Sequence, residues 1–185
     1  NISEKHKYLR YHETTTGGGL HSDGPQLNTP PKYLLLACIK NSAKGGDSLI
    51  ANCKKIYSDI KKNDKDVFNI LNKPFLFERR GFNYANQNIF SKPIFLKTGN
   101  NFLFRYLRVY IESAYKIKKL NLSNAKKNAL NILDSYLNNK KYQIKLKLTP
   151  GDILVVNNNI LAHGRTTFSL NKTMNQRDLL RVWVK

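Results

Sequence analysis

The sequence predicts a mainly β fold with flanking helices, built as an antiparallel barrel or sandwich. Short apolar or alternating segments recur along the whole chain, and only a few segments have helical periodicity. The length of 185 residues and a hydrophobic content of 41% suit one folded domain with a sizeable core. Because no internal repeat or linker-like stretch interrupts the pattern, we expect residues 1–185 to form a single domain.

The first predicted strands flank a glycine turn. Residues 33–39 (YLLLACI) are continuously apolar, which is typical of a strand buried on both faces. Gly45 and Gly46 mark a turn, and residues 47–52 have the composition of a strand that pairs with the first one.

Helices are predicted for three stretches. Apolar residues recur at helical spacing over residues 53–60, with lysines on the other side. Asp64 is a suitable N-cap for a second, short helix. Ser123 is a suitable N-cap for a third helix over residues 124–138, which carries an apolar stripe.

The rest of the chain adds strands around polar loops. They are predicted at residues 74–80, 93–97, 142–148, 153–156 and 178–184. The last of these, DLLRVWV, has the β-branched and aromatic content of a strand. No segment approaches the roughly 18 apolar residues of a membrane span. The start of the chain also lacks the basic-then-apolar pattern of a signal peptide.

The net charge of +20 allows two interpretations. Lysine and arginine displace counterions from phosphate backbones, which would suit a basic nucleic-acid-binding module on a β-rich fold. Alternatively the charge is compositional, since 24 lysines, 8 arginines and 23 asparagines are spread over the whole chain. No arginine-rich or aromatic-interleaved motif stands out, so we favour the compositional interpretation and keep nucleic-acid binding as the alternative.

Cysteine content and the first residue bear on compartment and completeness. Cys38 and Cys53 are too few for a disulfide framework, so a reducing, cytoplasmic setting is predicted. The chain begins with Asn1 and not with methionine, so we expect part of an N-terminal region to be missing from it.

His21 and Asp23 form the first candidate site. They are two residues apart, so in extended backbone both side chains project to one side. An imidazole and a carboxylate are two of the three ligands of a 2-His-1-carboxylate facial triad, which suits non-haem Fe(II). Alternatively the pair lies in a turn, with Asp23 bonded to its own loop before Gly24 and Pro25.

A second candidate site lies near the end of the chain. Arg177 and Arg181 are four residues apart, so on a strand they share a face. Two guanidiniums on one face of an apolar strand indicate an anion site, and His163 upstream offers a metal ligand beside it. The alternatives are a core histidine and surface cations on an edge strand.

Two further arginines, Arg105 and Arg165, are candidates for structural roles. Arg165 is expected to make a structural pair. Arg105, which lies in an aromatic stretch, either reaches an acidic group of a substrate or has a structural or surface role.

Four stretches, in this order, resemble the taurine dioxygenase-like (TauD/TfdA) branch of the Fe(II)/2-oxoglutarate-dependent oxygenases, which includes γ-butyrobetaine hydroxylase and clavaminate synthase relatives. LHSD at 20–23 resembles the first metal motif, and GGDS at 45–48 resembles a Gly-Gly-acidic-Thr/Ser turn. The segment from GDIL to LAHGR at 151–165 resembles the one that carries the last metal histidine. QRDLLRVW at 176–183 resembles the strand that binds the co-substrate.

The resemblance implies a role for each candidate residue. The implied Fe(II) ligands are His21, Asp23 and His163. Arg177 would pair with the distal carboxylate of 2-oxoglutarate in a bidentate fork. Arg181 and the hydroxyl of Ser48 would help to hold the carboxylate end that chelates iron, although the family more often has threonine at the position of Ser48.

The resemblance also implies a fold and a reaction. The fold would be a double-stranded β-helix (jelly roll) of the clavaminate synthase-like kind, whose first and last strands can lie in one sheet and so unite His21 with His163. The reaction would use O2 and 2-oxoglutarate, release succinate and CO2, and hydroxylate a small molecule such as an amino acid or another small acid. Halogenase relatives have a small residue in place of Asp23, so this aspartate favours hydroxylation or another oxidative outcome over halogenation.

Overall fold

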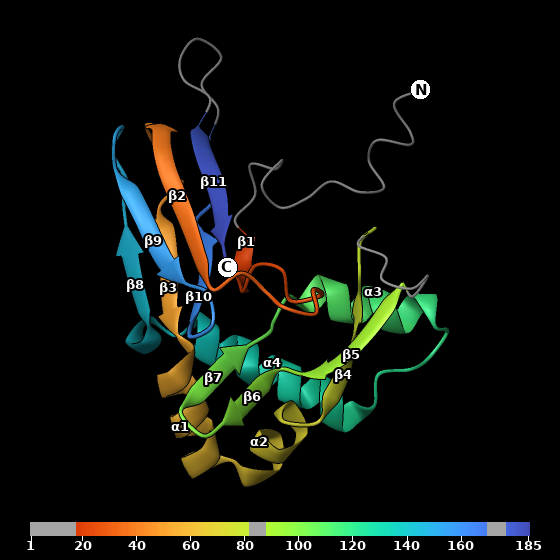
Figure 1. The fold of residues 1–185 in the computed structure, drawn as a ribbon. Coiled ribbons are helices and arrows are strands. Elements are labelled where there is room, and N and C mark those ends of the chain that lie inside the picture. The colour runs from red at the N-terminus through yellow and green to blue at the C-terminus, as the bar shows by residue number, and fades with distance from the viewer. Residues whose placement is uncertain (1–17, 82–87, 170–176) are drawn as a thin grey trace.

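The computed structural model describes residues 18–81, 88–169 and 177–185. Within these residues the chain forms two larger antiparallel sheets, two small hairpins and four α-helices (Figure 1). The larger sheets lie together on one side of the molecule, and helices α1, α2 and α4 lie beyond one end of them (Figure 1). The mainly β class predicted from the sequence, with some helices, is therefore confirmed.

The first sheet, called sheet A, unites strands from both ends of the chain. Its strands are, in spatial order, β1 (Gly18–His21), β10 (Leu161–Arg165), β3 (Ser48–Asn52) and β8 (Gln143–Leu146). One face of sheet A contributes Ala51 and Ala162 to the main core. His163 and Ile50 are register partners on the opposite face, because directly paired residues of antiparallel strands point the same way.

The second sheet, called sheet B, packs against that opposite face of sheet A. Its strands are, in spatial order, β11 (Asp178–Val184), β2 (Tyr33–Lys40) and β9 (Ile153–Asn157). Leu34 and Val156 are register partners, and both are almost completely buried. With Ile50 of sheet A they form a small apolar layer, so the inward side chains of the two sheets meet between them.

Helices make up most of the remaining structure. They are α1 (Cys53–Asn63), α2 (Lys65–Leu71), α3 (Arg108–Ile117), α4 (Asn124–Asn138) and the 3-10 turn η3 (Lys140–Tyr142). The predicted N-caps are confirmed, since Asp64 and Ser123 accept hydrogen bonds from the backbone N–H groups of Val67 and Lys126. Helix α3 was not predicted, because its N-cap Leu107 makes no side-chain cap hydrogen bond and so gives no start signal.

Two hairpins lie between α2 and α3. One pairs β4 (Pro74–Glu78) with β5 (Ile89–Pro93), and the other pairs β6 (Phe95–Thr98) with β7 (Asn101–Phe104). The strand predicted at residues 93–97 is confirmed for residues 95–97, which lie in β6, but it is not continuous with Pro93, which ends the preceding hairpin.

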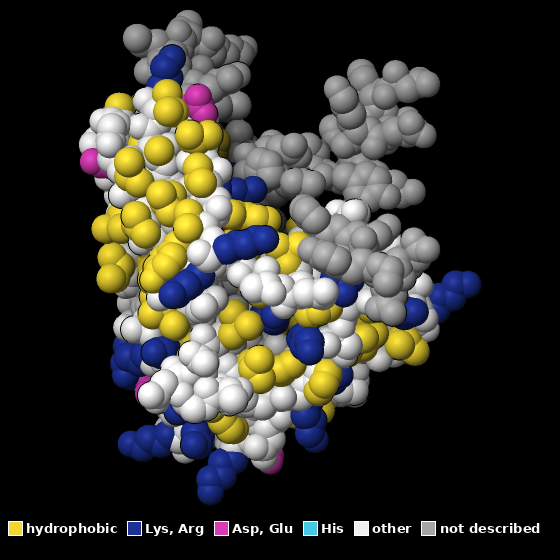
Figure 2. All heavy atoms as spheres, in the orientation of Figure 1, with side chains coloured by type: hydrophobic (Ala, Val, Ile, Leu, Met, Phe, Trp, Pro, Cys, Tyr) yellow, Lys and Arg dark blue, Asp and Glu magenta, His cyan; other side chains and the backbone are white. Residues whose placement is uncertain are grey.

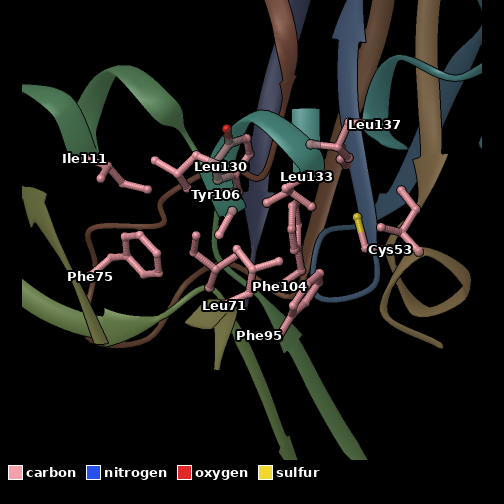
Figure 3. Close-up of a cluster of buried hydrophobic side chains, with 14 of the residues drawn as sticks. Cys53, Leu71, Phe75, Phe95, Phe104, Tyr106, Ile111, Leu130, Leu133 and Leu137 are labelled. Carbon is pink, nitrogen blue, oxygen red and sulfur yellow. The ribbon is translucent and has the colours of Figure 1, made fainter. Parts of the chain in front are cut away.

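The main core lies between sheet A, the helices and the hairpins. Phe75, Phe95 and Phe104 of the hairpins are fully buried against Leu130 and Leu133 of α4. Figure 3 shows these side chains converging from their separate elements. Burial of an aromatic or leucine side chain contributes about 1.5–3 kcal/mol, so this cluster anchors the helical layer to the sheets.

The structure corrects two predictions for residues 33–52. Strand β3 does not pair with β2 but lies in sheet A between β10 and β8. The chain changes sheets at Gly45 and Gly46, which have φ angles of +75° and +70° and so do not form a hairpin that keeps the two strands together. Strand β2 is also not buried on both faces, since Ile39 is 51% exposed.

The outer face of sheet B is apolar and exposed. Figure 2 shows hydrophobic side chains gathered over β9, β2 and β11. The exposed large apolar residues on these strands include Ile153, Val155, Leu180, Val182 and Val184. None of the helices in the described residues has the length and apolar character needed to cross a bilayer.

Candidate metal centre

Two adjacent strands of sheet A bring two histidines side by side. His21 ends β1 and His163 is central in β10, and the two are register partners although 142 positions separate them in the sequence. Their ring centroids lie 4.5 Å apart. The two histidines are brought together because β1 pairs with β10, so the contact depends on the topology of the sheet.

Asp23 completes the cluster from the loop after β1. Its carboxylate is buried, with 5% of the residue exposed. The Oδ1 atom lies 3.6 Å from Nε2 of His21 and 3.6 Å from Nε2 of His163. The predicted trio His21, Asp23 and His163 therefore shares one small volume, and its ligand atoms all lie within 4.8 Å of one another.

The donor set fits a divalent transition metal. Nδ1 of His21 lies 2.8 Å from the carbonyl oxygen of Gly19, which as an acceptor fixes the proton on Nδ1 and leaves the lone pair on Nε2. The separation of 3.6 Å between Oδ1 and each Nε2 is close to the roughly 3 Å between adjacent ligand atoms that each lie about 2.1 Å from one ion. Two imidazoles and one carboxylate are the composition of a facial triad.

The charge states also suit metal binding. Burial by itself would raise the pKa of Asp23, but hydrogen bonding and charge attraction from His163 and His21 hold that pKa well below its usual range. Burial lowers the pKa of His163, and the neighbouring His21 lowers it further against the opposing effect of Asp23. An ionised carboxylate beside a neutral imidazole is the protonation state that a metal ion requires.

Asn158 holds the loop that carries Asp23, and the sequence did not reveal this role. Its side-chain oxygen accepts a hydrogen bond from the backbone N–H of Asp23 at 2.8 Å, and its Nδ2 donates to the Asp23 carbonyl at 2.9 Å. The same Nδ2 also donates to the carbonyl of Pro31. The only local signal was the run of three asparagines at 157–159, which by itself favours a turn.

The second oxygen of Asp23 faces β11. Trp183 donates its indole N–H to Oδ2 at 2.7 Å, and Nη1 of Arg181 lies 3.2 Å from the same oxygen. Arg181 thus lies beside the histidine cluster, next to the carboxylate that completes it. The sequence singled out Arg181 but not Trp183, because a tryptophan in an apolar strand has an ordinary packing role.

Arg177 lies in a half-buried position just before β11. Its side chain packs so closely on Gly46 that a Cβ atom there would be 3.1 Å from Cδ of Arg177. The guanidinium lies 5.9 Å from the ring centroid of Phe168. Burial lowers the pKa of Arg177, and its buried Nε has no hydrogen-bond partner among the described residues. A half-buried guanidinium with a buried, unused donor fits an anionic ligand.

Of the three remaining candidates, Ser48 and Arg165 lie on the face of sheet A that carries His163, and Arg105 lies elsewhere. Ser48 is 3% exposed and is the register partner of Arg165, on the face of sheet A that also carries His163. Arg165 stacks on Phe168 at 4.8 Å from its ring centroid. Arg105 has a structural role, because its buried guanidinium donates to the carbonyls of three loop residues, which are Pro25, Leu27 and Asn28.

Comparison with known families identifies the chain. A family model described as "Taurine catabolism dioxygenase TauD, TfdA family" matches residues 3–183. The chain belongs to the TauD/TfdA family. This match spans nearly all of the 185 residues, so the membership applies to both sheets and to the helices.

Individual relatives agree with the family. The human gamma-butyrobetaine dioxygenase is 28% identical over 171 residues, which are 83% of this chain and 41% of that protein. A uridine-5'-phosphate dioxygenase of a Streptomyces species is 25% identical over 154 residues, which are 82% of this chain and 56% of that protein. The chain therefore spans about half the length of the curated relatives it matches.

A solved structure shares the fold. An asparagine oxygenase in complex with Fe(II), 2S,3S-3-hydroxyasparagine and succinate superposes with a TM-score of 0.72 and 18% identity, over 93% of this chain and 51% of that one. The relatives named here are dioxygenases and an oxygenase, so they give no support to the alternative of a basic nucleic-acid-binding module.

Proposed function

We propose that the chain forms the catalytic domain of an Fe(II)- and 2-oxoglutarate-dependent dioxygenase. The observation that carries the proposal is the cluster of His21, Asp23 and His163, in which one carboxylate oxygen faces two imidazole nitrogens. The family and the dioxygenase relatives support the same reaction class. When bound, the iron would supply activation of O2 coupled to the oxidative decarboxylation of 2-oxoglutarate to succinate and CO2.

In this proposal the metal ligands are held ready by their own contacts. The Gly19 carbonyl orients His21, and Asn158 fixes the backbone on both sides of the Asp23 side chain. A metal site works best when its ligands need no rearrangement, so these contacts favour rapid and tight occupation. Three protein ligands of this kind would hold the iron and would leave further coordination positions for the co-substrate and O2.

The co-substrate would be held by its two carboxylates. Arg177 would bind the distal carboxylate of 2-oxoglutarate through a planar fork of N–H groups, and its buried Nε supports this role. Arg181 and Ser48 would help to bind the carboxylate next to the keto group. Arg181 is near the metal ligands through its contact with Asp23, and Ser48 is buried on the face of sheet A that carries His163.

The proposal extends to fold, domain and compartment. Two antiparallel sheets with an apolar layer between them are compatible with a double-stranded β-helix, or jelly roll, of the clavaminate synthase-like kind. We assign residues 1–185 to one oxygenase domain. The two cysteines are free and buried, which supports the cytoplasmic location predicted from the sequence.

The proposed substrate is a small molecule, such as an amino acid or another small acid. The names of the relatives refer to small molecules, namely a betaine, a nucleotide and asparagine. The histidine cluster supports only the reaction, and the substrate class is supported by the relatives alone.

The test uses the purified full chain under anaerobic conditions. We expect one equivalent of Fe(II) to bind, and subsequent addition of 2-oxoglutarate to produce a visible charge-transfer absorption band. Admission of O2 should convert 2-oxoglutarate to succinate, measured by NMR. The proposal fails if Fe(II) binds with the same affinity after His163→Ala, or if 2-oxoglutarate neither binds nor is consumed by the iron-loaded chain.

A further inference from the structure

The two oxygens of Asp23 have different surroundings. Oδ1 faces the imidazole nitrogens of both histidines at 3.6 Å. Oδ2 faces the other way, where it accepts the indole N–H of Trp183 at 2.7 Å and lies 3.2 Å from Nη1 of Arg181. One oxygen is thus directed to the cluster, and the other is taken up by side chains of β11.

We propose that Trp183 is a positioning residue that makes Asp23 a one-oxygen ligand of the metal. The inference rests on the proposed metal site. A carboxylate can bind a metal through one oxygen or through both, and rotation about its terminal bond interchanges the two. A hydrogen bond to Oδ2 opposes that rotation and keeps Oδ1 directed at Nε2 of His21 and His163. Binding through one oxygen also leaves one more coordination position for co-substrate and O2.

Trp183 suits this role better than Arg181. The contact of Arg181 is divided, since its Nη1 lies 3.2 Å from Oδ2 and 3.4 Å from Oδ1. The indole has one N–H and no acceptor, so its single donor specifies one oxygen. Arg181 is also assigned to the co-substrate in the proposed function, and Trp183 would hold Asp23 while the guanidinium binds another anion.

The backbone of β11 fixes the position of the indole. Trp183 is the register partner of Leu34, which is fully buried in the layer between the sheets. The Trp183 residue itself is 38% exposed, so its ring is not part of either buried cluster. Loss of the indole should therefore affect the Asp23 carboxylate more than it affects the free energy of unfolding.

The test compares metal binding in Trp183→Phe and Trp183→Gln. Phenylalanine keeps an aromatic ring but has no N–H, whereas glutamine keeps an N–H donor at a similar distance from Cβ. Zn(II) affinity of the full chain is measured by calorimetry, and unfolding of the metal-free protein is measured by thermal denaturation. Loss of a hydrogen-bond partner of a metal ligand costs about 10–100-fold in affinity. We expect Trp183→Phe to weaken Zn(II) binding about tenfold, and Trp183→Gln to restore part of it.

A matched control comes from the preceding residue, Val182, which is 44% exposed and points to the opposite face of the strand. Val182→Thr should leave Zn(II) affinity unchanged. The proposal is overturned if Trp183→Phe binds Zn(II) as tightly as the parent chain, or if the phenylalanine and glutamine variants lose affinity equally.

The unmodified chain provides a second measurement that needs no variant. Trp183 is the only tryptophan, so the fluorescence of the chain reports on this one indole. Saturation with Zn(II), which is diamagnetic and not a general quencher, should shift or change its emission. An unchanged emission while calorimetry records binding would overturn the role of Trp183 but not the metal site. If the parent chain binds no Zn(II) or Fe(II) at all, the proposed function fails as well.

Discussion

On β11, alternate side chains point toward sheet A and away from it. Arg181 and Trp183 point inward, since their register partners are Leu36 and Leu34, which pack in the layer between the sheets. Leu180 and Val182 point outward and are 57% and 44% exposed. A sheet with one solvated face usually has apolar residues inside and polar residues outside. This strand has the reverse arrangement near its end.

The difference shows that polarity alone does not identify the buried face of a strand. The inward polar groups of β11 are stabilised by Asp23, whose Oδ2 lies 2.7 Å from the indole nitrogen of Trp183 and 3.2 Å from Nη1 of Arg181. The outward apolar groups have no such partner among the described residues. Substitutions on the inner face of sheet B are therefore expected to change ligand binding or stability. Substitutions on its outer face are expected to change neither. Four substitutions test this contrast.

The largest effect, on metal affinity, is expected from a change at Asp23, the carboxylate that Arg181 and Trp183 contact. Asp23→Ala removes one ligand of the proposed metal and the acceptor of Trp183. Loss of a ligand should exceed the 10–100-fold cost of losing a ligand's hydrogen-bond partner, so Zn(II) affinity should fall by more than about a hundredfold. Calorimetry on the full chain measures it. Asp66→Ala, at the start of α2, is the control for loss of one carboxylate, and equal affinity in both variants would contradict the assignment.

The second effect concerns folding and not binding. Leu34 lies on the inner face of β2 and is 0% exposed, so Leu34→Ala should leave a cavity between the sheets. Such truncations cost about 2–5 kcal/mol in the free energy of unfolding. Urea denaturation of the metal-free chain measures this cost. A loss below about 1 kcal/mol would mean that the layer between the sheets is less tightly packed than its burial indicates.

The third effect is confined to the co-substrate. Arg177→Ala removes the half-buried guanidinium beside Gly46 and should weaken 2-oxoglutarate binding by about 2 kcal/mol, or about thirtyfold. Zn(II) affinity should stay constant, because Arg177 makes no contact with the three proposed ligands among the described hydrogen bonds. Lys44→Ala, at an exposed cation near the same turn, is the control for a general effect of positive charge. Equal losses in both variants would favour that general effect.

Local signals account for much of what could be predicted from the sequence. Ser123 and Asp64 were recognisable as helix caps, because a cap hydrogen bond joins residues three apart. His21 and Asp23 were recognisable as a candidate pair because they are only two residues apart, although Asp23 lies in the loop after β1 and not in the strand. Each of these signals depends only on neighbours in the chain.

Long-range contacts could not be predicted in the same way. The hydrogen bonds of Asp23 with Asn158 and Trp183 join residues 135 and 160 positions apart, and nothing in either local segment specifies the partner. The separation of β2 and β3 into different sheets has the same cause, since each strand takes its partners from the last third of the chain. Pairing of distant strands is decided by packing of the whole fold and not by the propensity of either strand.

The smallest effect is expected on the outer face of sheet B. Val155 is 57% exposed and is the register partner of Leu35, on the side of the sheet away from the cluster. Val155→Thr keeps the β-branched shape that a strand favours and replaces one methyl group with a hydroxyl. Surface substitutions of this kind usually change the free energy of unfolding by less than about 0.5 kcal/mol. We therefore expect unchanged urea denaturation and unchanged Zn(II) affinity, measured beside Leu34→Ala and Asp23→Ala. A Val155→Thr variant that bound Zn(II) several-fold more weakly would show that the outer face is coupled to Asp23 through the sheet, and the contrast between the two faces would then be wrong.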